Sequence, residues 1–234
     1  HIIGRTTWDL FCSMQYNPKA IYHKNNEILR DVFYERKWSI NTCNRFTIFV
    51  SQAQIPIKGF HFMLEALQIL KQKYPTVKLY VAGAMNPLNH NMKAMGYARL
   101  LYRIAKEADI LDSVLYLGIL NEEEMCKQYL ASHVFVSPSS IENSPNSVGE
   151  AMLLGVPVVS SNVGGVSDLL ADKKEGFLYQ YDAPYMLAGY IDRIFSDDDL
   201  ARSFSIAARS RAENTHNREI NLKDLLDIYS DICM

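Results

Sequence analysis

The chain has 234 residues, of which 48% are hydrophobic and 21% are charged, and its formal net charge is −2. This composition is typical of a water-soluble globular protein that buries a sizeable core. The nearly balanced charge excludes a general attraction to nucleic acid. The mildly basic stretch from 193 to 218 is interpreted as a solvated helix face, and contact of this stretch with anionic lipid stays open as an alternative. No apolar run reaches the ~18 residues that a membrane-spanning helix needs, and no signal peptide is visible.

The four cysteines lie far apart in the sequence, at positions 12, 43, 126 and 233. None belongs to a C-x-x-C pair or lies at metal-binding spacing from histidines, so we expect reduced cysteines that mostly pack in the interior. This usage is typical of a cytoplasmic protein. Because the first residue is histidine rather than methionine, we also expect the chain to be a fragment or a processed product.

From residue 46 on, short apolar runs alternate with segments of helical periodicity. Such alternation predicts an α/β fold, in which a parallel sheet has helices on both faces. The predicted strands cover residues 46–51, 77–83, 113–118, 134–137, 156–160 and, with a weaker signal, 176–179. The predicted helices between them follow the stripe from Phe60 to Leu70 and cover residues 92–108, 122–130 and 146–154.

The two ends of the chain differ from this alternating region. Residues 1–45 contain both tryptophans and several polar breaks, and we interpret them as an incomplete outer segment with a linker. After Ala183 the pattern is wholly helical, and the last helix, within residues 216–234, carries an apolar stripe. We therefore predict three parts, of which the middle one, residues 46–215, is the α/β domain. The stripe consists of Leu222, Leu225, Leu226, Tyr229, Ile232 and Cys233.

Two glutamates lie where an α/β protein places ligand chemistry. Glu142 follows the predicted strand at 134–137, and open parallel sheets bind ligands at the carboxyl ends of their strands. Glu150 falls in the first turns of the next helix, whose N-terminal N–H groups attract an anion such as a diphosphate. Spacing alone leaves another interpretation open, because Glu150 lies opposite an apolar stripe, as solvated carboxylates do, and Glu142 fits an ordinary loop.

Lys58 and Gly59 follow the first predicted strand. A lysine there reaches a phosphate over the strand ends, and the glycine permits close backbone approach; the alternative is an ordinary surface lysine at a helix start. Gly164 and Gly165 predict a turn, in preference to a ligand contact. The sequence has no G-x-G-x-x-G after a strand and no G-x-S-x-G, Walker or H-E-x-x-H motif, so a dinucleotide cofactor has little support.

Taken together, these motifs resemble the carboxyl-terminal half of a GT-B glycosyltransferase of family 4. The segments that carry the resemblance are Lys58–Gly59, LYVAG at 79–83, LYLGIL at 115–120, and residues 137–179 with the pattern E-x7-E followed by EAM-x-x-G-x-P-V-V and GG. The resemblance covers residues 40–234, and bacterial enzymes that build capsular or exported polysaccharides are particularly similar. It implies a Rossmann-like domain. It also implies that residues 1–45 are the remnant of an N-terminal acceptor domain, and that the last helix crosses back toward that domain.

The resemblance also implies roles for single residues. Glu142 matches the position that contacts the donor sugar, and Lys58 matches the one that neutralises the diphosphate, so both are expected to be catalytic. Glu150 matches the position that holds the ribose hydroxyls. Further donor-binding positions are Gly59, Gln52, Asn146 and Ser147, together with Gly118, Ile119 and Leu120 in the loop expected to meet the base.

Gln52 departs from the family's pattern. Many members have an arginine there, in a V-G-R-L pattern ahead of the K-G pair. A glutamine cannot supply a cationic fork for phosphate. Diphosphate neutralisation is therefore expected to rest more heavily on Lys58.

The resemblance implies a retaining hexosyltransferase-type enzyme that transfers a sugar from a nucleotide-sugar donor to a glycan or lipid-linked acceptor, in cell-surface polysaccharide biosynthesis. It implies no metal or other cofactor and a cytoplasmic location, with peripheral contact of the full-length protein to the inner membrane face left open. Two alternatives stay open: a nucleotide-sugar epimerase of GT-B architecture, and a nucleotide-binding domain without catalysis. Because the acceptor domain is expected to be missing, the 234-residue chain is expected to be inactive by itself.

Overall fold

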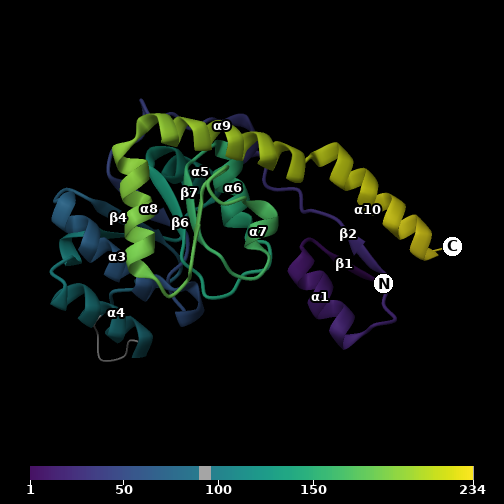
Figure 1. The fold of residues 1–234 in the computed structure, drawn as a ribbon, viewed down its shortest axis with the longest axis horizontal. Coiled ribbons are helices and arrows are strands. Elements are labelled where there is room, and N and C mark those ends of the chain that lie inside the picture. Colours follow the sequence, from purple (N-terminus) through teal and green to yellow (C-terminus); the bar gives the residue numbers. More distant parts are fainter. Residues whose placement is uncertain (90–95, 234) are drawn as a thin grey trace.

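A six-stranded parallel sheet forms the centre of the molecule (Figure 1), in a computed structural model that describes residues 1–89 and 96–233. The strand order is β5-β4-β3-β6-β7-β8. From β3 the chain first winds outward to β4 and β5, and then returns to place β6 on the other side of β3. The sheet therefore has a topological switch point between β3 and β6, where open α/β sheets bind ligands. The strands are β3 (Thr47–Val50), β4 (Lys78–Ala82), β5 (Val114–Gly118), β6 (Val134–Ser137), β7 (Val158–Ser161) and β8 (Phe177–Tyr179).

Helices cover both faces of this sheet. They are α2 (Val32–Glu35), α3 (Phe60–Lys73), α4 (Gly96–Glu107), α5 (Glu122–Ala131), α6 (Asn146–Leu154), α7 (Val166–Leu169), α8 (Pro184–Ser196) and α9 (Asp198–Thr215), whereas the last helix, α10 (Arg218–Cys233), extends away from the sheet (Figure 1). Helix α3 packs against α4 and α8, whereas α6 packs against α2, α5 and α9. The predicted α/β fold is confirmed, and the strands lie within two residues of their predicted bounds. Residues 92–95 of one predicted helix, and residue 234, lie outside the described residues.

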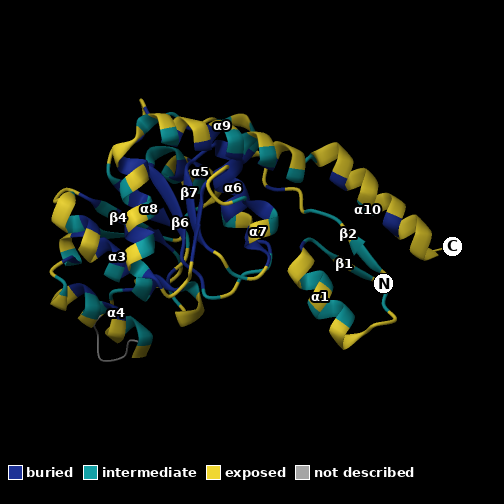
Figure 2. Cartoon of the chain, viewed as in Figure 1, coloured by how far each residue is buried: buried dark blue, intermediate teal, exposed yellow. Residues whose placement is uncertain are grey.

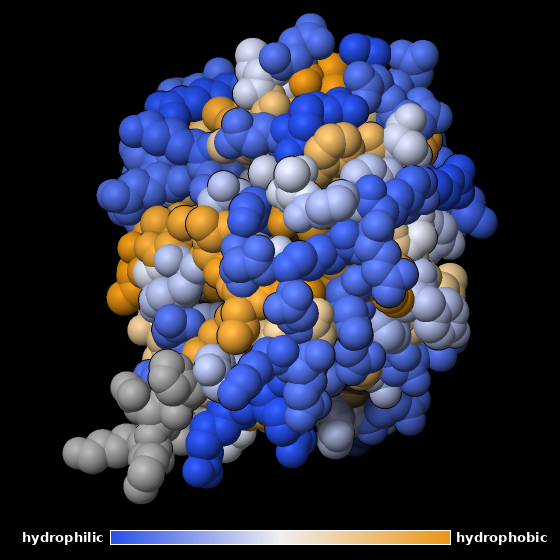
Figure 3. All heavy atoms as spheres, turned by 90° about the vertical axis from the view of Figure 1, so that its left-hand side faces the viewer, coloured by the Kyte–Doolittle hydropathy of each residue, from blue (hydrophilic) through white to orange (hydrophobic). Residues whose placement is uncertain are grey.

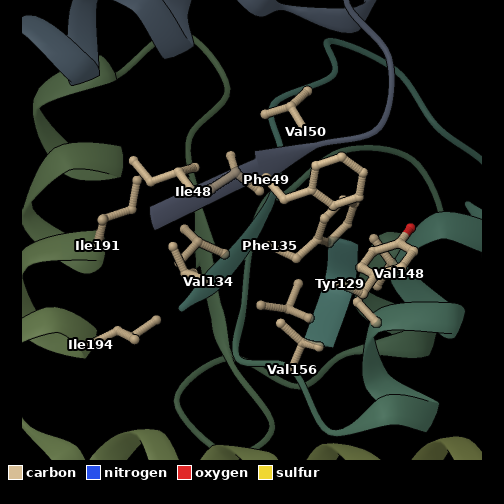
Figure 4. Packing of buried hydrophobic residues seen from close by; sticks show 14 of the residues in the cluster. Ile48, Phe49, Val50, Tyr129, Val134, Phe135, Val148, Val156, Ile191 and Ile194 are labelled. Carbon is tan, nitrogen blue, oxygen red and sulfur yellow. The ribbon is translucent and has the colours of Figure 1, made fainter. Parts of the chain in front are cut away.

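The core follows from this double cover. All residues of β3, β6 and β7 are buried, as the continuous apolar runs require, and the strands are dark blue in Figure 2. Phe49 of β3 and Phe135 of β6 pack against the ring of Tyr129 from α5, with ring centroids 5.0 Å apart in both pairs (Figure 4). The Tyr129 hydroxyl donates to the Ser147 carbonyl at 3.1 Å, so this aromatic cluster also fixes the first turn of α6.

The first residues of the chain form a small unit beside the main sheet. Strands β1 (Ile2–Gly4) and β2 (Tyr22–Lys24) pair in parallel, with helix α1 (Thr7–Tyr16) between them. This unit lies on the same side of the molecule as α10 (Figure 1). The residues that follow behave differently: Leu29, Phe33 and Trp38 are buried in the main core. Residues 29–43 therefore pack with the α/β domain, and β1, α1 and β2 stand apart from its core.

Two arginines of the basic stretch from 193 to 218 do not lie on a solvated face, and the interpretation was wrong for them. Arg209 donates to the carbonyls of Leu153 at 2.8 Å, Arg36 at 2.7 Å and Tyr34 at 3.1 Å. Arg211 donates to two carbonyls near the end of α7. The last carbonyls of a helix lack intrahelical donors, and a guanidinium from α9 satisfies them here.

Helix α10 leaves most of its apolar side chains in solvent (Figure 2). Leu222, Leu226 and Tyr229 are each 50% exposed or more, and only the neighbouring Ile228 is well buried among the apolar side chains described in this helix. The stripe predicted for the last helix is therefore an exposed surface in this chain.

The face that carries α3 and α4 is mostly polar, with an apolar area in its middle (Figure 3). Strand β5 is one edge of the sheet, and all five of its residues are partly exposed. The cysteines are free; Cys43 and Cys126 are buried. Across residues 1–89 and 96–233, no helix is long and apolar enough to cross a membrane, and no cluster of three or more metal-binding side chains occurs.

Gly164 is a position at which we expect a methyl group to be damaging. Its φ is +50°, and a Cβ there would lie 1.9 Å from the Glu142 carbonyl oxygen. Gly164→Ala should therefore lower the free energy of unfolding by about 1–3 kcal/mol. Gly189, inside α8, has open space around it, so Gly189→Ala should raise that free energy by up to ~1 kcal/mol. Urea denaturation measures both, and equal stability of the two variants would contradict the close approach.

Candidate functional site

Two adjoining cavities open at the carboxyl edge of the sheet, beside the switch point. The first, of about 300 Å³, we call the Lys58 cavity, and the second, of about 710 Å³, the Glu150 cavity. Ser51, Gln52 and Ser147 line both. The Lys58 cavity also contains Arg5, Lys58, Ser139, Glu142 and Asn146, and the Glu150 cavity also contains Arg30, Met85, Ile119, Leu120 and Glu150.

Lys58 and Glu142 form an ion pair inside the first cavity. The Lys58 Nζ lies 2.6 Å from Glu142 Oε1, and the Ser139 hydroxyl donates to the same oxygen at 2.7 Å. The lysine side chain is 24% exposed and the glutamate side chain 16%. Both are thus held at the cavity wall, which argues against an ordinary surface lysine and an ordinary loop acid.

Local backbone geometry brings these two side chains together. Lys58 ends a 3₁₀ turn, Pro56–Lys58, just ahead of α3, and Gly59 follows with a φ of +66°. A Cβ at Gly59 would lie 1.8 Å from the Pro138 carbonyl oxygen, so only glycine permits the loop after β3 to touch the loop after β6. The Ser140 N–H donates to the Ile57 carbonyl at 2.8 Å and joins the same two loops.

The N-terminus of α6 faces the Lys58 cavity without a side-chain cap. Its N-cap residue is Pro145, which offers no side-chain acceptor, and its first turn contains no acidic residue. The Val148 N–H donates to the Pro145 carbonyl at 3.0 Å, whereas the N–H groups of Asn146 and Ser147 have no partner within the helix. Together with the partial positive charge of a helix start, they form a site suited to an anion.

Glu150 is buried, so its interpretation as a solvated carboxylate was wrong. The side of α6 opposite Val148 is covered by α5 and by the segment that carries Arg30. Arg30 Nη2 lies 2.7 Å from Glu150 Oε1, and the Tyr129 hydroxyl lies 3.4 Å from Oε2. Burial raises the pKa of the Glu150 carboxyl, and the Arg30 guanidinium opposes this rise.

The loop after β5 contributes unevenly to the second cavity. Ile119 and Leu120 line it, and Ile119 is 77% exposed. Gly118 has a φ of +79°, and its carbonyl accepts a hydrogen bond from the Gly83 N–H at 2.9 Å. Gly118 therefore shapes the loop, and Ile119 and Leu120 form an apolar wall opposite Glu150.

Sequence reasoning missed two cationic residues of these cavities, Arg5 and Arg30. Both belong to residues 1–45, and neither lies in a recognisable motif. Arg5 Nη1 donates to Asn146 Oδ1 at 3.0 Å, and Arg30 pairs with Glu150 as described above. The neutral Gln52 in place of the family's arginine was the one available hint that a cation comes from elsewhere.

Comparison with known proteins identifies the family. The family described as "Glycosyl transferases group 1" matches residues 32–211. D-inositol 3-phosphate glycosyltransferase of Corynebacterium urealyticum is 28% identical over 75% of this chain and 41% of its own length. The capsular polysaccharide biosynthesis glycosyltransferase CapM of Staphylococcus aureus is 25% identical over 74% of this chain and 43% of its own length. The chain thus spans less than half the length of these curated relatives.

Solved structures show the same fold. HepE from Anabaena, in complex with UDP and glucose, superposes with a TM-score of 0.84 at 20% identity, covering 97% of this chain and 62% of that one. A TarM mutant from S. aureus, in complex with fondaparinux, alpha-GlcNAc-glycerol and UDP, gives 0.82 at 18% identity, covering 97% and 43%. The neighbours are GT-B glycosyltransferases, and the family match covers more than half of the chain. This chain therefore belongs to the glycosyl transferases group 1 family.

Proposed function

We propose that this chain is the donor-binding part of a retaining glycosyltransferase and binds a nucleotide-sugar across the two cavities. The observation that carries the proposal is that the Lys58–Glu142 pair and the uncapped start of α6 face one cavity, while Glu150 lines the adjoining one. This arrangement suits a ligand with a diphosphate in the middle and hydroxyl groups on both sides.

The diphosphate is assigned to the Lys58 cavity. Lys58 and the first N–H groups of α6 place positive charge where negative charge develops as the sugar leaves, which is the largest contribution a preorganised site makes. Glu142 Oε1 already accepts two hydrogen bonds, and Oε2 accepts none from residues 1–89 and 96–233. That free oxygen is available to a sugar hydroxyl, and the chemistry requires no metal.

The nucleoside is assigned to the Glu150 cavity. Glu150 accepts the two ribose hydroxyls, and the apolar side chains of Ile119, Leu120 and Met85 contact the base. HepE and the TarM mutant were solved in complex with UDP, which supports a nucleotide donor here.

The names of two relatives support a role in cell-surface polysaccharide synthesis. CapM acts in capsular polysaccharide biosynthesis, and AmsK of Erwinia amylovora, 28% identical over 73% of this chain, is named for amylovoran biosynthesis. We extend the proposal to a glycan or lipid-linked acceptor and to a cytoplasmic site of action at the inner face of the membrane.

Lys58→Ala tests the diphosphate assignment. Because a lysine on phosphate makes a charge-assisted bond, the variant should bind a nucleoside diphosphate about 10-fold more weakly or worse, while its affinity for the nucleoside stays unchanged. Isothermal titration calorimetry measures both affinities. Lys71→Ala, which removes a lysine paired with Asp112 outside both cavities, is the matched control. Equal losses for the two ligands would rule out a phosphate contact.

A Glu150 variant tests the ribose contact. Glu150→Ala should weaken nucleoside and nucleoside diphosphate alike by about 1–3 kcal/mol, because both contain the ribose. Glu175→Gln, which changes a buried glutamate outside both cavities, should leave binding unchanged. An unaltered affinity of Glu150→Ala would refute the ribose contact.

Replacing Glu150 should raise stability at pH 7, although it weakens binding. Folding raises the pKa of this carboxyl, so its contribution to stability is fully present below the unfolded pKa of about 4.3 and is lost as the pH rises through the folded pKa. At pH 7 the ionised Glu150 carboxyl therefore lowers the free energy of unfolding. Glu150→Gln removes this unfavourable contribution. The variant should melt at or above the wild-type temperature at pH 7 and lose its advantage near pH 4. A lower melting temperature at pH 7 would make Glu150 a stabilising residue.

Donor binding without transfer is the expected behaviour of this chain alone. Neither cavity is lined by a histidine among the described residues, and both lining glutamates are already in ion pairs. Positioning an acceptor against the donor lowers the reaction barrier by on the order of 7–11 kcal/mol in favourable cases. The described cavities contain no side chain that we assign to an acceptor. Labelled donor with an acceptor extract should give product with the full-length protein and none with this chain. Turnover by this chain without an acceptor would indicate an epimerase.

A further inference from the structure

Lys58 alone does not balance the charge of the diphosphate assigned to the Lys58 cavity. Its lysine is already paired with Glu142 at 2.6 Å, and Gln52 on its wall is neutral. A diphosphate carries more than one negative charge, so a single lysine shared with a carboxylate leaves part of that charge unbalanced. A second cation at this cavity is required if the assignment is correct.

Among residues 1–89 and 96–233, Arg5 is the remaining charged side chain on the wall of this cavity. Its Nη1 donates to Asn146 Oδ1 at 3.0 Å, which places the guanidinium beside the first residue of α6. The same nitrogen lies 2.6 Å from Glu27 Oε2, and the Glu27 side chain is 50% exposed. Such an exposed pair contributes little energy, so a phosphate can take over this contact at low cost.

The backbone around Arg5 is tied directly to the loop that carries Glu142. The Thr6 hydroxyl donates to Asn143 Oδ1 at 2.5 Å, and the Asn143 amide donates to Asp9 Oδ2 at 2.8 Å. The Arg5 N–H in turn donates to Asp9 Oδ2 at 2.9 Å. Arg5 is therefore held in place relative to the cavity, rather than reaching it from a free segment.

Arg30 cannot take this role in the described arrangement. It lines the Glu150 cavity rather than the Lys58 cavity, and it neutralises the buried Glu150 at 2.7 Å. Drawing it away would leave a buried carboxylate unpaired, which is costly. Arg5, in contrast, is paired with a carboxylate that is half exposed.

We infer that Arg5 binds the donor diphosphate and supplies the cation that Gln52 does not. The planar guanidinium fork matches phosphate oxygens and binds two of them at once, as a lysine cannot. The inference rests on the proposed function, because it needs a diphosphate in the Lys58 cavity. Residues 1–45 then contribute a ligand contact to the donor site and do not merely pack beside it.

The test is calorimetric titration of the 234-residue chain with UDP, GDP and ADP and with the matching nucleosides. For the tightest diphosphate, Arg5→Gln should weaken binding roughly 10- to 100-fold and leave nucleoside binding unchanged. Arg202→Gln, which breaks an exposed pair with Asp199 on α9, is the matched control and should bind as wild type does. Adding Gln52→Arg to Arg5→Gln should restore most of the lost affinity, whereas Gln52→Arg in the otherwise wild-type chain should raise affinity less, because Arg5 already supplies the cation.

Three results would overturn the inference. Diphosphate binding by Arg5→Gln at the wild-type level would show that Arg5 makes no contact. Equal losses for diphosphate and nucleoside, with a lowered melting temperature, would show that Arg5 only supports the fold. If the wild-type chain binds none of the diphosphates, the proposed function itself fails, and this outcome is distinct from the first two.

Discussion

The candidate site depends on two close backbone contacts, one on each side of the loop after β6. The loop after β6 carries Glu142, and its carbonyl oxygens at Pro138 and Glu142 lie so close to Gly59 and Gly164 that a Cβ on either would clash at less than 2 Å. Both glycines have positive φ. The loop is thus held between the turn after β3 and the turn after β7, and this fixes Lys58 against Glu142 at the switch point of the sheet.

The charged groups at the two cavities do not stabilise the unliganded chain. Burial raises the pKa of the glutamate at the second cavity, and an arginine 120 positions away in the sequence opposes that rise only in part. The first helix turn facing the other cavity is left without a cap. Both features are unfavourable in a protein without ligand and are typical of functional sites, where local stability is given up for binding.

The sequence predicted the parts of the structure that depend on local pattern. Apolar alternation and turn residues gave the strands and helices, and the rule that parallel strands bind ligands at their carboxyl ends placed Lys58 and Glu142 at one edge. The burial of Glu150 was not predictable, because the periodicity of a helix shows which residues share a face but not what covers it. The contacts of Arg5 and Arg30 were missed for a related reason. They join residues 141 and 120 positions apart and have no motif of their own.

The small unit of β1, α1 and β2 has a consequence for how ligand and fold support each other. A pair of strands is marginal by itself in water, so this unit owes its order to bonds with the α/β domain, such as those of Thr6 with Asn143 and Thr7 with Asp168. Linkage between sites is reciprocal. Any ligand that bridges this unit and the start of α6 must strengthen their attachment by as much as that attachment improves its own affinity. Binding of such a ligand and docking of the first 24 residues are then coupled equilibria, in which each makes the other more favourable.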